Sequence, residues 1–296
     1  MTEAVRWGPF ELLHRIDAGP MVETWVALRR SPGGAEQRVW LERLLPSAGA
    51  DVAAAVLARA AAASRLTQAT VVHIIEHGEI DGVAFVASKL VDGMDLSAML
   101  RAMEGRSERF ELSTAIFITS ELARALHGAH HARVVHGDVT ASDIRIGFGG
   151  EVKLGGFAIA AARAANKPEG GRGDDPAGDL LGLGVVAHQL LTGHRPSDGS
   201  EGVSALHHLE VVDSSGGATT MAFSGVVERL LEPDPSVRLS SAGLLVAALG
   251  AFDQPDDLRR ELGTLVRRHM STMVAPRLDA ATLARLRSAL GTPSDD

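Results

Sequence analysis

The sequence contains no cysteine. This absence excludes a disulfide framework, a thiolate zinc site, an iron–sulfur cluster and a cysteine nucleophile. A chain without thiols suits a reducing compartment, and we expect a cytoplasmic location. The segment from Met1 to Ala4 lacks the basic and then apolar pattern of a secretory signal. No apolar run reaches the ~20 residues that a membrane-spanning helix requires, so we expect no transmembrane segment.

Lysine is nearly absent, because Lys89, Lys153 and Lys167 are the only three, against 26 arginines. Acidic side chains outnumber basic ones by 37 to 29, which gives a formal net charge of −8. This balance argues against nucleic acid as a partner. Aromatic residues make up 4% of the chain, which leaves no evident hot-spot cluster to identify a protein partner.

The 296 residues, 45% of them hydrophobic and 22% charged, have the composition of a folded globular protein. The length allows one large core or two joined lobes. The first third consists of short alternating runs separated by glycine and proline turns, around an alanine-rich helical stretch at 51–66. We expect strands at 10–16, 24–28, 38–44, 71–77 and 83–88.

Amphipathic helical patterns dominate the chain beyond residue 91. A short segment of predicted β structure at 134–154 interrupts them. Glycine-rich stretches at 170–178 and 214–217 are typical of loops. The last helical segment is expected over 257–290, with a helix cap at Asp279. The other expected helices are 95–102, 113–131, 179–191, 225–231 and 241–250.

Four motifs in order resemble those of a protein kinase. His136-Gly137-Asp138, followed by Gly156-Phe157-Ala158, resembles a kinase catalytic loop that leads into the metal-binding motif. Residues 178–196 resemble the helix that anchors the C-terminal lobe, and 231–238 resemble the late Asp-Pro-x-x-Arg signature. The resemblance is to bacterial serine/threonine kinases in particular and covers roughly residues 8–251.

This resemblance implies an α+β, bilobal kinase-like fold with a small β-rich N-lobe and a larger helical C-lobe. It divides the chain into an N-terminal segment (1–9), the N-lobe (10–90), the C-lobe (91–252) and a C-terminal helical extension (253–296). We expect the extension to dock on the C-lobe or to engage a partner helix in a groove.

The nucleotide-binding positions of the N-lobe depart from the family pattern. Kinases cover the ATP phosphates with a glycine-rich loop and grip them with a lysine on the next strand. The corresponding loop, 17–22, retains only Gly19, which is also compatible with a plain β-turn, and Glu42 stands at the lysine position. Trp40 replaces the small residue that borders adenine, and either fills the base pocket or is an ordinary core tryptophan. In the hinge region, Ser88 is at the gatekeeper position and Leu90 follows it.

The catalytic loop retains one acid/base position, Asp138, although its carboxylate could serve only to order the loop. Thr140 stands where the family has a lysine, and Asp143 replaces an asparagine but keeps an oxygen able to hold Mg²⁺. Gly156 replaces the metal-binding aspartate. Phosphoryl transfer depends on positioning and on cations, so these replacements predict a loss of several decades in rate.

No serine, threonine or tyrosine occurs between Ala158 and Pro168, and Gly137 replaces the arginine that receives an activating phosphate in the family. We therefore expect no phosphorylation switch in this segment.

Residues that the family uses to build the C-lobe are retained. Asp179 is expected to hydrogen-bond the backbone near His136, which stacks with Phe157, and Glu169 is expected to pair with Arg238. The histidines of the helix before the catalytic loop share a face, but the resemblance favours a structural role for them over a metal site. They are His127, His130 and His131.

The sequence thus predicts a pseudokinase, inactive or severely impaired, that acts as a protein-binding scaffold or regulator in signalling. No cofactor is expected, with ATP and Mg²⁺ weak or absent, and the partner is a protein rather than nucleic acid. One alternative is a divergent kinase that uses Arg43 or Arg59 as its cation and Asp143 as its metal ligand. The other is nucleotide binding without catalysis.

Overall fold

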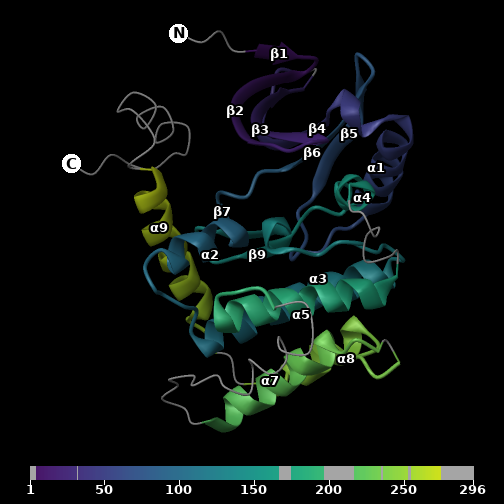
Figure 1. Ribbon diagram of the computed structural model, residues 1–296. Helices are drawn as coiled ribbons and strands as arrows, with labels where there is room; N and C mark the ends of the chain where they lie inside the picture. Colours follow the sequence, from purple (N-terminus) through teal and green to yellow (C-terminus); the bar gives the residue numbers. More distant parts are fainter. Residues whose placement is uncertain are drawn as a thin grey trace, which may run out of the picture.

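The computed structural model describes residues 5–31, 33–166, 175–196, 217–234, 236–252 and 255–274. A β-rich N-terminal lobe lies above a helical C-terminal lobe (Figure 1). The predicted α+β, bilobal fold is therefore confirmed.

The N-lobe is a six-stranded antiparallel sheet in the order β1-β2-β3-β4-β6-β5. Along β4, Val39 and Leu41 are fully buried in the upper core, so the alternating residues Trp40 and Glu42 face the other lobe. Residues 5–7, before the predicted first strand, also join the sheet. The strands are β1 (Val5–Trp7), β2 (Phe10–Ala18), β3 (Val22–Arg30), β4 (Glu36–Leu44), β5 (Ile74–Ile80) and β6 (Val83–Lys89).

Helix α1 (Ala50–Ala63) covers one end of this sheet and packs against β5, β6 and α4. Alanine has the highest helix propensity, and its small side chain lets the helix approach its neighbours closely. Val56, Ala60 and Ala63 are buried and belong to the same core as the helices below. The helix therefore joins the packing of the two lobes.

The C-lobe is built around α3 (Leu112–His131), which packs against α5, α8, α9 and β9. A small sheet, β7-β8-β9, lies at the junction with the N-lobe. The remaining elements are β7 (Gly93–Asp95), α2 (Leu96–Glu104), β8 (Ile144–Gly147), β9 (Val152–Leu154), α4 (Ala160–Ala165), α5 (Pro176–Thr192), α7 (Gly217–Leu231), α8 (Ala242–Leu249) and α9 (Leu258–Val274).

Two helices begin earlier than predicted. Helix α5 starts at Pro176 because Asp175 caps it, accepting a hydrogen bond of 2.7 Å from Gly178 N. The glycine-rich loop therefore ends before 178, and residues 170–174 lie outside the described part. Helix α7 starts at Gly217 rather than at 225. Strand β5 starts at Ile74, later than the predicted 71, and Val71 makes a single bridge to Leu154.

Helix α9 lies along α2, α3, β7 and β8 of the C-lobe (Figure 1). Leu258, Leu262 and Val266 recur at helical spacing and are buried. A Cβ at Gly263 would lie 2.4 Å from the carbonyl oxygen of Phe148, so the absence of a side chain permits this close contact. The described part of the predicted extension thus packs on the C-lobe; residues 275–296 lie outside the described part.

Among the described residues, no helix combines the length and the apolar character that a membrane span requires.

Candidate functional site

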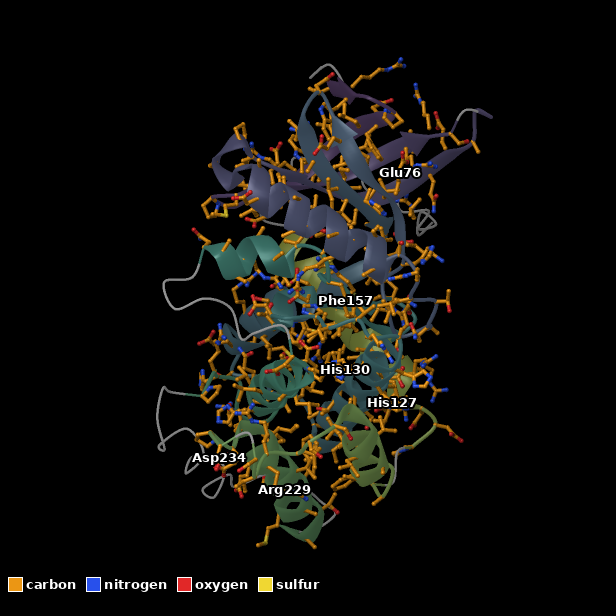
Figure 2. The ribbon with its side chains drawn as sticks, turned by 90° about the vertical axis from the view of Figure 1, so that its right-hand side faces the viewer. Glu76, His127, His130, Phe157, Arg229 and Asp234 are labelled. Carbon is orange, nitrogen blue, oxygen red and sulfur yellow. The ribbon has the colours of Figure 1, made fainter. Side chains whose placement is uncertain are left out.

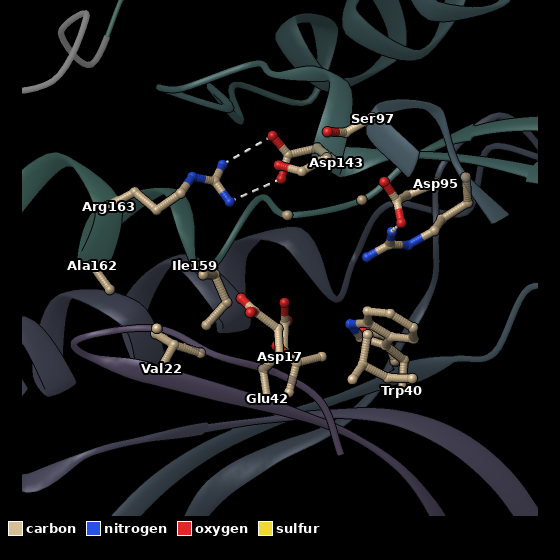
Figure 3. Close-up of a pocket in the computed structure, with 18 of the residues that line it drawn as sticks. Asp17, Val22, Trp40, Glu42, Asp95, Ser97, Asp143, Ile159, Ala162 and Arg163 are labelled. Atoms are coloured by element: carbon tan, nitrogen blue, oxygen red, sulfur yellow. Dashed lines mark hydrogen bonds and ion pairs between the residues drawn. The ribbon is translucent and has the colours of Figure 1, made fainter. Parts of the chain in front are cut away.

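A cavity of about 630 Å³ lies between the lobes, lined by β2, β3 and β4 above and by β8, α2, α4 and the 142–156 segment below (Figure 3). This volume is within the range of small-molecule sites, roughly 300–1,000 Å³. Six of the positions singled out in the sequence line it together, although they are far apart along the chain. They are Gly19, Trp40, Glu42, Ser88, Asp143 and Gly156.

Three other predicted positions are not part of this lining. Leu90 lies in the connector between the lobes. Thr140 lies behind Asp143, whose Oδ2 accepts a hydrogen bond of 2.7 Å from its hydroxyl. Asp138 is 1% exposed, is not part of the cavity lining and pairs with Arg163, which is.

Arg163, on α4, connects the two catalytic-loop carboxylates. Its Nε lies 3.0 Å from Asp138 Oδ2, and its Nη1 lies 2.9 Å from Asp143 Oδ1. Its Nη2 also donates to Asp143 Oδ2 at 2.9 Å (Figure 3). The same nitrogen donates to the carbonyl oxygen of Asp138 at 3.0 Å. Burial disfavours the guanidinium cation, but the two carboxylates outweigh this effect and raise the pKa of Arg163. One cation thus bridges both acidic groups.

Gly156 makes room for the carboxylate of Asp143. Its φ is +79°, a conformation that favours glycine, and a Cβ at this position would lie 2.1 Å from Asp143 Oδ1. A side chain at position 156 and the present position of the Asp143 carboxylate are therefore incompatible.

Glu42 faces the cavity from β4 and is partly buried. Burial raises its pKa to about 7, although the positive charges of Arg145 and Arg163 oppose the shift. At neutral pH this carboxyl is about half protonated. It also accepts a hydrogen bond from Trp40.

Trp40 and Arg145 meet across the cavity. The guanidinium carbon of Arg145, on β8, lies 4.1 Å from the centroid of the Trp40 ring, and Arg145 Nη1 lies 3.8 Å from Asp95 Oδ2 (Figure 3). Trp40 therefore lines the cavity wall.

Asp179, at the start of α5, holds the catalytic loop. Its carboxylate accepts hydrogen bonds from His136 N (2.8 Å) and Gly137 N (2.7 Å), and it contacts His130 Nε2 at 2.8 Å. The rings of His136 and Phe157 lie 4.7 Å apart, centroid to centroid. Figure 2 shows Phe157 near the junction of the lobes and His130 further into the helical lobe.

Arg238 donates hydrogen bonds to the carbonyl oxygens of Glu232 (2.8 Å), Pro233 (3.1 Å) and Ala177 (3.2 Å). Its expected partner, Glu169, lies outside the described residues. Arg238 thus joins the loop after α7 to the start of α5.

The two arginines considered as substitute cations do not line the cavity. Arg43 pairs with Glu23 on β3 and stacks over Trp7, and Arg59 donates to the carbonyl oxygen of His136 at 3.1 Å. The arginines that do line it are Arg101, Arg145 and Arg163, which the sequence analysis missed. A lone arginine inside the run Ala160-Ala-Ala-Arg-Ala-Ala165, soon after the metal-binding motif, was the available signal for Arg163.

Within the described ranges, no three histidine or acidic side chains form a group suited to a metal ion. His130 contacts Asp179, so at least this histidine of the helix has a structural partner.

Comparison with known proteins identifies the family. No family model matches the chain. It is 30% identical to the serine/threonine-protein kinase PknH of Mycobacterium tuberculosis, over 72% of this chain and 37% of the relative. It is 28% identical to PknD of the same species (98% and 44%) and 27% identical to the tyrosine-protein kinase MasK of Myxococcus xanthus (69% and 36%).

Solved structures agree with this result. The crystal structure of the M. tuberculosis PknI kinase domain superposes with a TM-score of 0.63 at 20% identity, covering 91% of this chain and 99% of that domain. The chain spans less than half the length of the relatives named above. It belongs to the protein kinase-like superfamily, of the bacterial serine/threonine kinase type.

The expectation that no cofactor is used, with ATP and Mg²⁺ weak or absent, is contradicted by these comparisons. The relatives PknD and PknH are serine/threonine-protein kinases, a class of enzyme that uses ATP and Mg²⁺. The cavity fits such a group: it has the necessary volume, Asp143 and Glu42 offer the oxygen ligands that Mg²⁺ prefers, and Arg101, Arg145 and Arg163 offer positive charge for phosphates. Mg²⁺ usually needs only one or two protein carboxylates beside the phosphates.

Proposed function

We propose that this chain is a nucleotide-binding regulatory protein of the serine/threonine kinase family that transfers phosphate slowly or not at all, and that it acts through protein partners. The observation that carries the proposal is the pairing of Arg163 with both Asp138 and Asp143. A base that accepts a substrate proton must be free to approach the hydroxyl, whereas the Asp138 carboxylate here is 1% exposed and paired with a cation.

Nucleotide would bind in the cavity between the lobes. Asp143 is the residue suited to hold Mg²⁺, and Arg101 and Arg163 are suited to contact phosphates, since β4 carries Glu42 and no lysine. When bound, ATP–Mg²⁺ supplies a phosphoryl donor whose charge the metal neutralises. The side chains of this protein orient the nucleotide and hold Asp138 away from solvent.

The proposed partner is a protein, and the proposed location is the cytoplasm, which agrees with the absence of cysteine. The exposed face of α9, which carries Arg260 and Arg268, is the proposed docking element. If removal of residues 253–296 left both stability and partner binding unchanged, this role would be wrong.

A divergent active kinase is the second candidate. The retention of Asp138 and of an oxygen ligand at Asp143 favours it, with Arg163 rather than Arg43 or Arg59 as the cation near them. This candidate requires Arg163 to leave Asp138 when substrate binds.

Calorimetry with ATP–Mg²⁺ and a phosphotransfer assay distinguish the two. We expect binding, with turnover at least a hundredfold below the roughly 1–100 s⁻¹ of protein kinases, and faster turnover in Arg163→Gln. Arg124→Gln, which removes a surface arginine paired with Glu121, is the matched control. Turnover of the wild-type protein in the usual range that Asp138→Asn abolishes would favour the active kinase instead.

A further inference from the structure

Arg59 of α1 links the N-lobe to the catalytic loop. Its Nη1 donates to the carbonyl oxygen of His136 at 3.1 Å and to that of Val135 at 3.4 Å. These carbonyl groups lie 77 and 76 positions further along the chain. One side chain of the N-lobe thus binds two consecutive peptide groups of the C-lobe.

Gly137 makes room for this guanidinium. Its φ is +85°, and a Cβ at this position would lie 2.9 Å from Nη1 and 3.1 Å from Nη2 of Arg59. Kinases carry an arginine at this position of the catalytic loop. In this chain the loop position has no side chain, and an arginine reaches the same stretch of backbone from α1.

Asp179 binds the same stretch of backbone through its N–H groups. Its carboxylate accepts hydrogen bonds from His136 N at 2.8 Å and from Gly137 N at 2.7 Å. Hydrogen bonds that follow one another through peptide groups polarise and strengthen each other. Burial lowers the pKa of Arg59, and the negative charge of Asp179 opposes this shift. The cation and the carboxylate therefore stabilise the backbone at 135–137 together.

This link differs from the one that protein kinases use. In kinases an ion pair between a strand lysine and a helix glutamate couples the helix of the N-lobe to its neighbouring strand. Here β4 carries Glu42 and no lysine, and α1 contains no glutamate. The link from α1 runs instead to the backbone of the other lobe.

We propose that Arg59 is a positioning residue that couples α1 to the catalytic loop, so that a displacement of α1 moves the backbone at 135–138. This inference rests on the proposed function and names the route by which a protein partner that displaces α1 reaches Asp138. Asp138 follows Gly137 directly, and its N donates to His136 Nδ1 at 3.3 Å. A shift of the His136 and Gly137 peptides therefore carries Asp138 with it.

Hydrogen exchange of the Gly137 amide is the direct readout, because this N–H is bonded to buried Asp179. Ala55→Gly lies on the exposed face of α1 and weakens the helix without removing a contact to the loop. We expect it to raise the exchange rate of Gly137 about threefold to fivefold. Ala247→Gly, at an exposed position of α8, controls for a general loss of stability and should leave this rate within about 1.5-fold.

The same helix substitution in an Arg59 variant tests the route. Arg59→Met keeps the length of the side chain but removes its hydrogen bonds, so adding Ala55→Gly should change the Gly137 rate by less than about 1.5-fold. Arg59→Lys can still donate to a carbonyl group but lacks the planar fork, and should retain part of the effect. Arg65→Met is the matched control and should retain all of it, because Arg65 is exposed and its Nε contacts Ala62 O at 3.5 Å.

Three results would overturn the coupling. They are no change at Gly137 on Ala55→Gly in the wild-type background, equal acceleration by Ala55→Gly and Ala247→Gly, and an equal effect of Ala55→Gly with Arg59 or Met at position 59. None of them affects nucleotide binding, which calorimetry with ATP–Mg²⁺ tests separately. Conversely, a wild-type protein that binds no nucleotide but transmits the change from α1 to Gly137 would refute the proposed function and leave the coupling in place.

Discussion

Substitution of Gly156 by alanine has two energetic costs, the unfavourable φ and the clash with Asp143, and a control glycine separates them. An alanine there meets an unfavourable φ of +79° and places its Cβ 2.1 Å from Asp143 Oδ1, whereas Gly82 has a φ of +74° with no atom within 4 Å of an added Cβ. We expect Gly82→Ala to lower the free energy of unfolding by about 1 kcal/mol, the cost of the φ alone. Gly156→Ala should lower it by about 2–4 kcal/mol. Urea denaturation of both variants measures the difference, and equal losses would show that Asp143 moves away without cost.

Glu42 predicts a pH dependence of stability. Its pKa is raised from 4.5 to about 7 in the folded protein. The folded state therefore binds more protons than the unfolded state between these values, and the contribution of this group falls as the pH rises through that window. Relative to wild type, Glu42→Gln should become more stable by about 2 kcal/mol between about pH 5.5 and about pH 7.5.

The control for this measurement is Glu79→Gln, which removes an exposed carboxylate on β5. Its stability difference from wild type should change little over the same pH range. A stability difference for Glu42→Gln that is flat with pH would contradict the raised pKa.

Sequence reasoning located some residues of the site and missed others for a physical reason. Trp40 and Glu42 were located because the resemblance to the kinase strand motif assigns both positions to the nucleotide site, and alternation along the strand puts them on one face. Arg163 was not, since its ion pairs form with residues 20 and 25 positions earlier in the chain. Only the packing of α4 beside the catalytic loop brings these charges together, and no local pattern encodes that packing.

At the scale of elements, the contact between α9 and the turn at 147–150 predicts an unusual response to alanine. A glycine inside a helix normally costs about 1 kcal/mol relative to alanine. Gly225, in α7, has no atom within 4 Å of an added Cβ, so Gly225→Ala should stabilise the protein by about 0.5–1 kcal/mol. At Gly263 a Cβ would lie 2.4 Å from the oxygen of Phe148, so Gly263→Ala should destabilise it by about 1–3 kcal/mol.

Thermal denaturation of both variants checks the prediction that Gly225→Ala raises the stability and Gly263→Ala lowers it. Stabilisation by both would mean that α9 does not hold its place on the C-lobe.

The predictability of elements follows the strength of their local signals. The strands β2, β3, β4 and β6 overlap the predicted segments because alternation and turn residues are encoded locally. The start of α5 was misjudged because glycine-rich composition outweighed the Asp175-Pro176 capping signal. The early start of α7 at Gly217 has no comparable signal in the sequence, and there tertiary packing extends the helix.

For the whole molecule, the position of the cavity between the lobes predicts that nucleotide shifts the thermal midpoint seen by tryptophan fluorescence and the midpoint seen by circular dichroism by different amounts. All three tryptophans lie in the N-lobe, whereas most helical residues lie in the C-lobe. The upper core is a small cluster around Phe10, Leu41 and Phe85, while the larger core lies below it. ATP at about a hundred times its Kd should contribute about 2.7 kcal/mol of stability, and it should raise the midpoint seen by fluorescence more than the midpoint seen by circular dichroism.

Melting followed by both signals with and without ATP–Mg²⁺ tests this expectation. Equal shifts would indicate that the two lobes unfold as one cooperative unit. A shift confined to circular dichroism would place the nucleotide away from the cavity.

The close approach of Gly156 and Asp143 also bears on how this protein can change over time. An aspartate reintroduced at position 156 would enter space that the Asp143 carboxylate now occupies, and that carboxylate is held by Arg163. This single substitution toward the family motif would therefore destabilise the folded protein. A side chain at position 156 therefore requires a compensating change at Asp143 or Arg163.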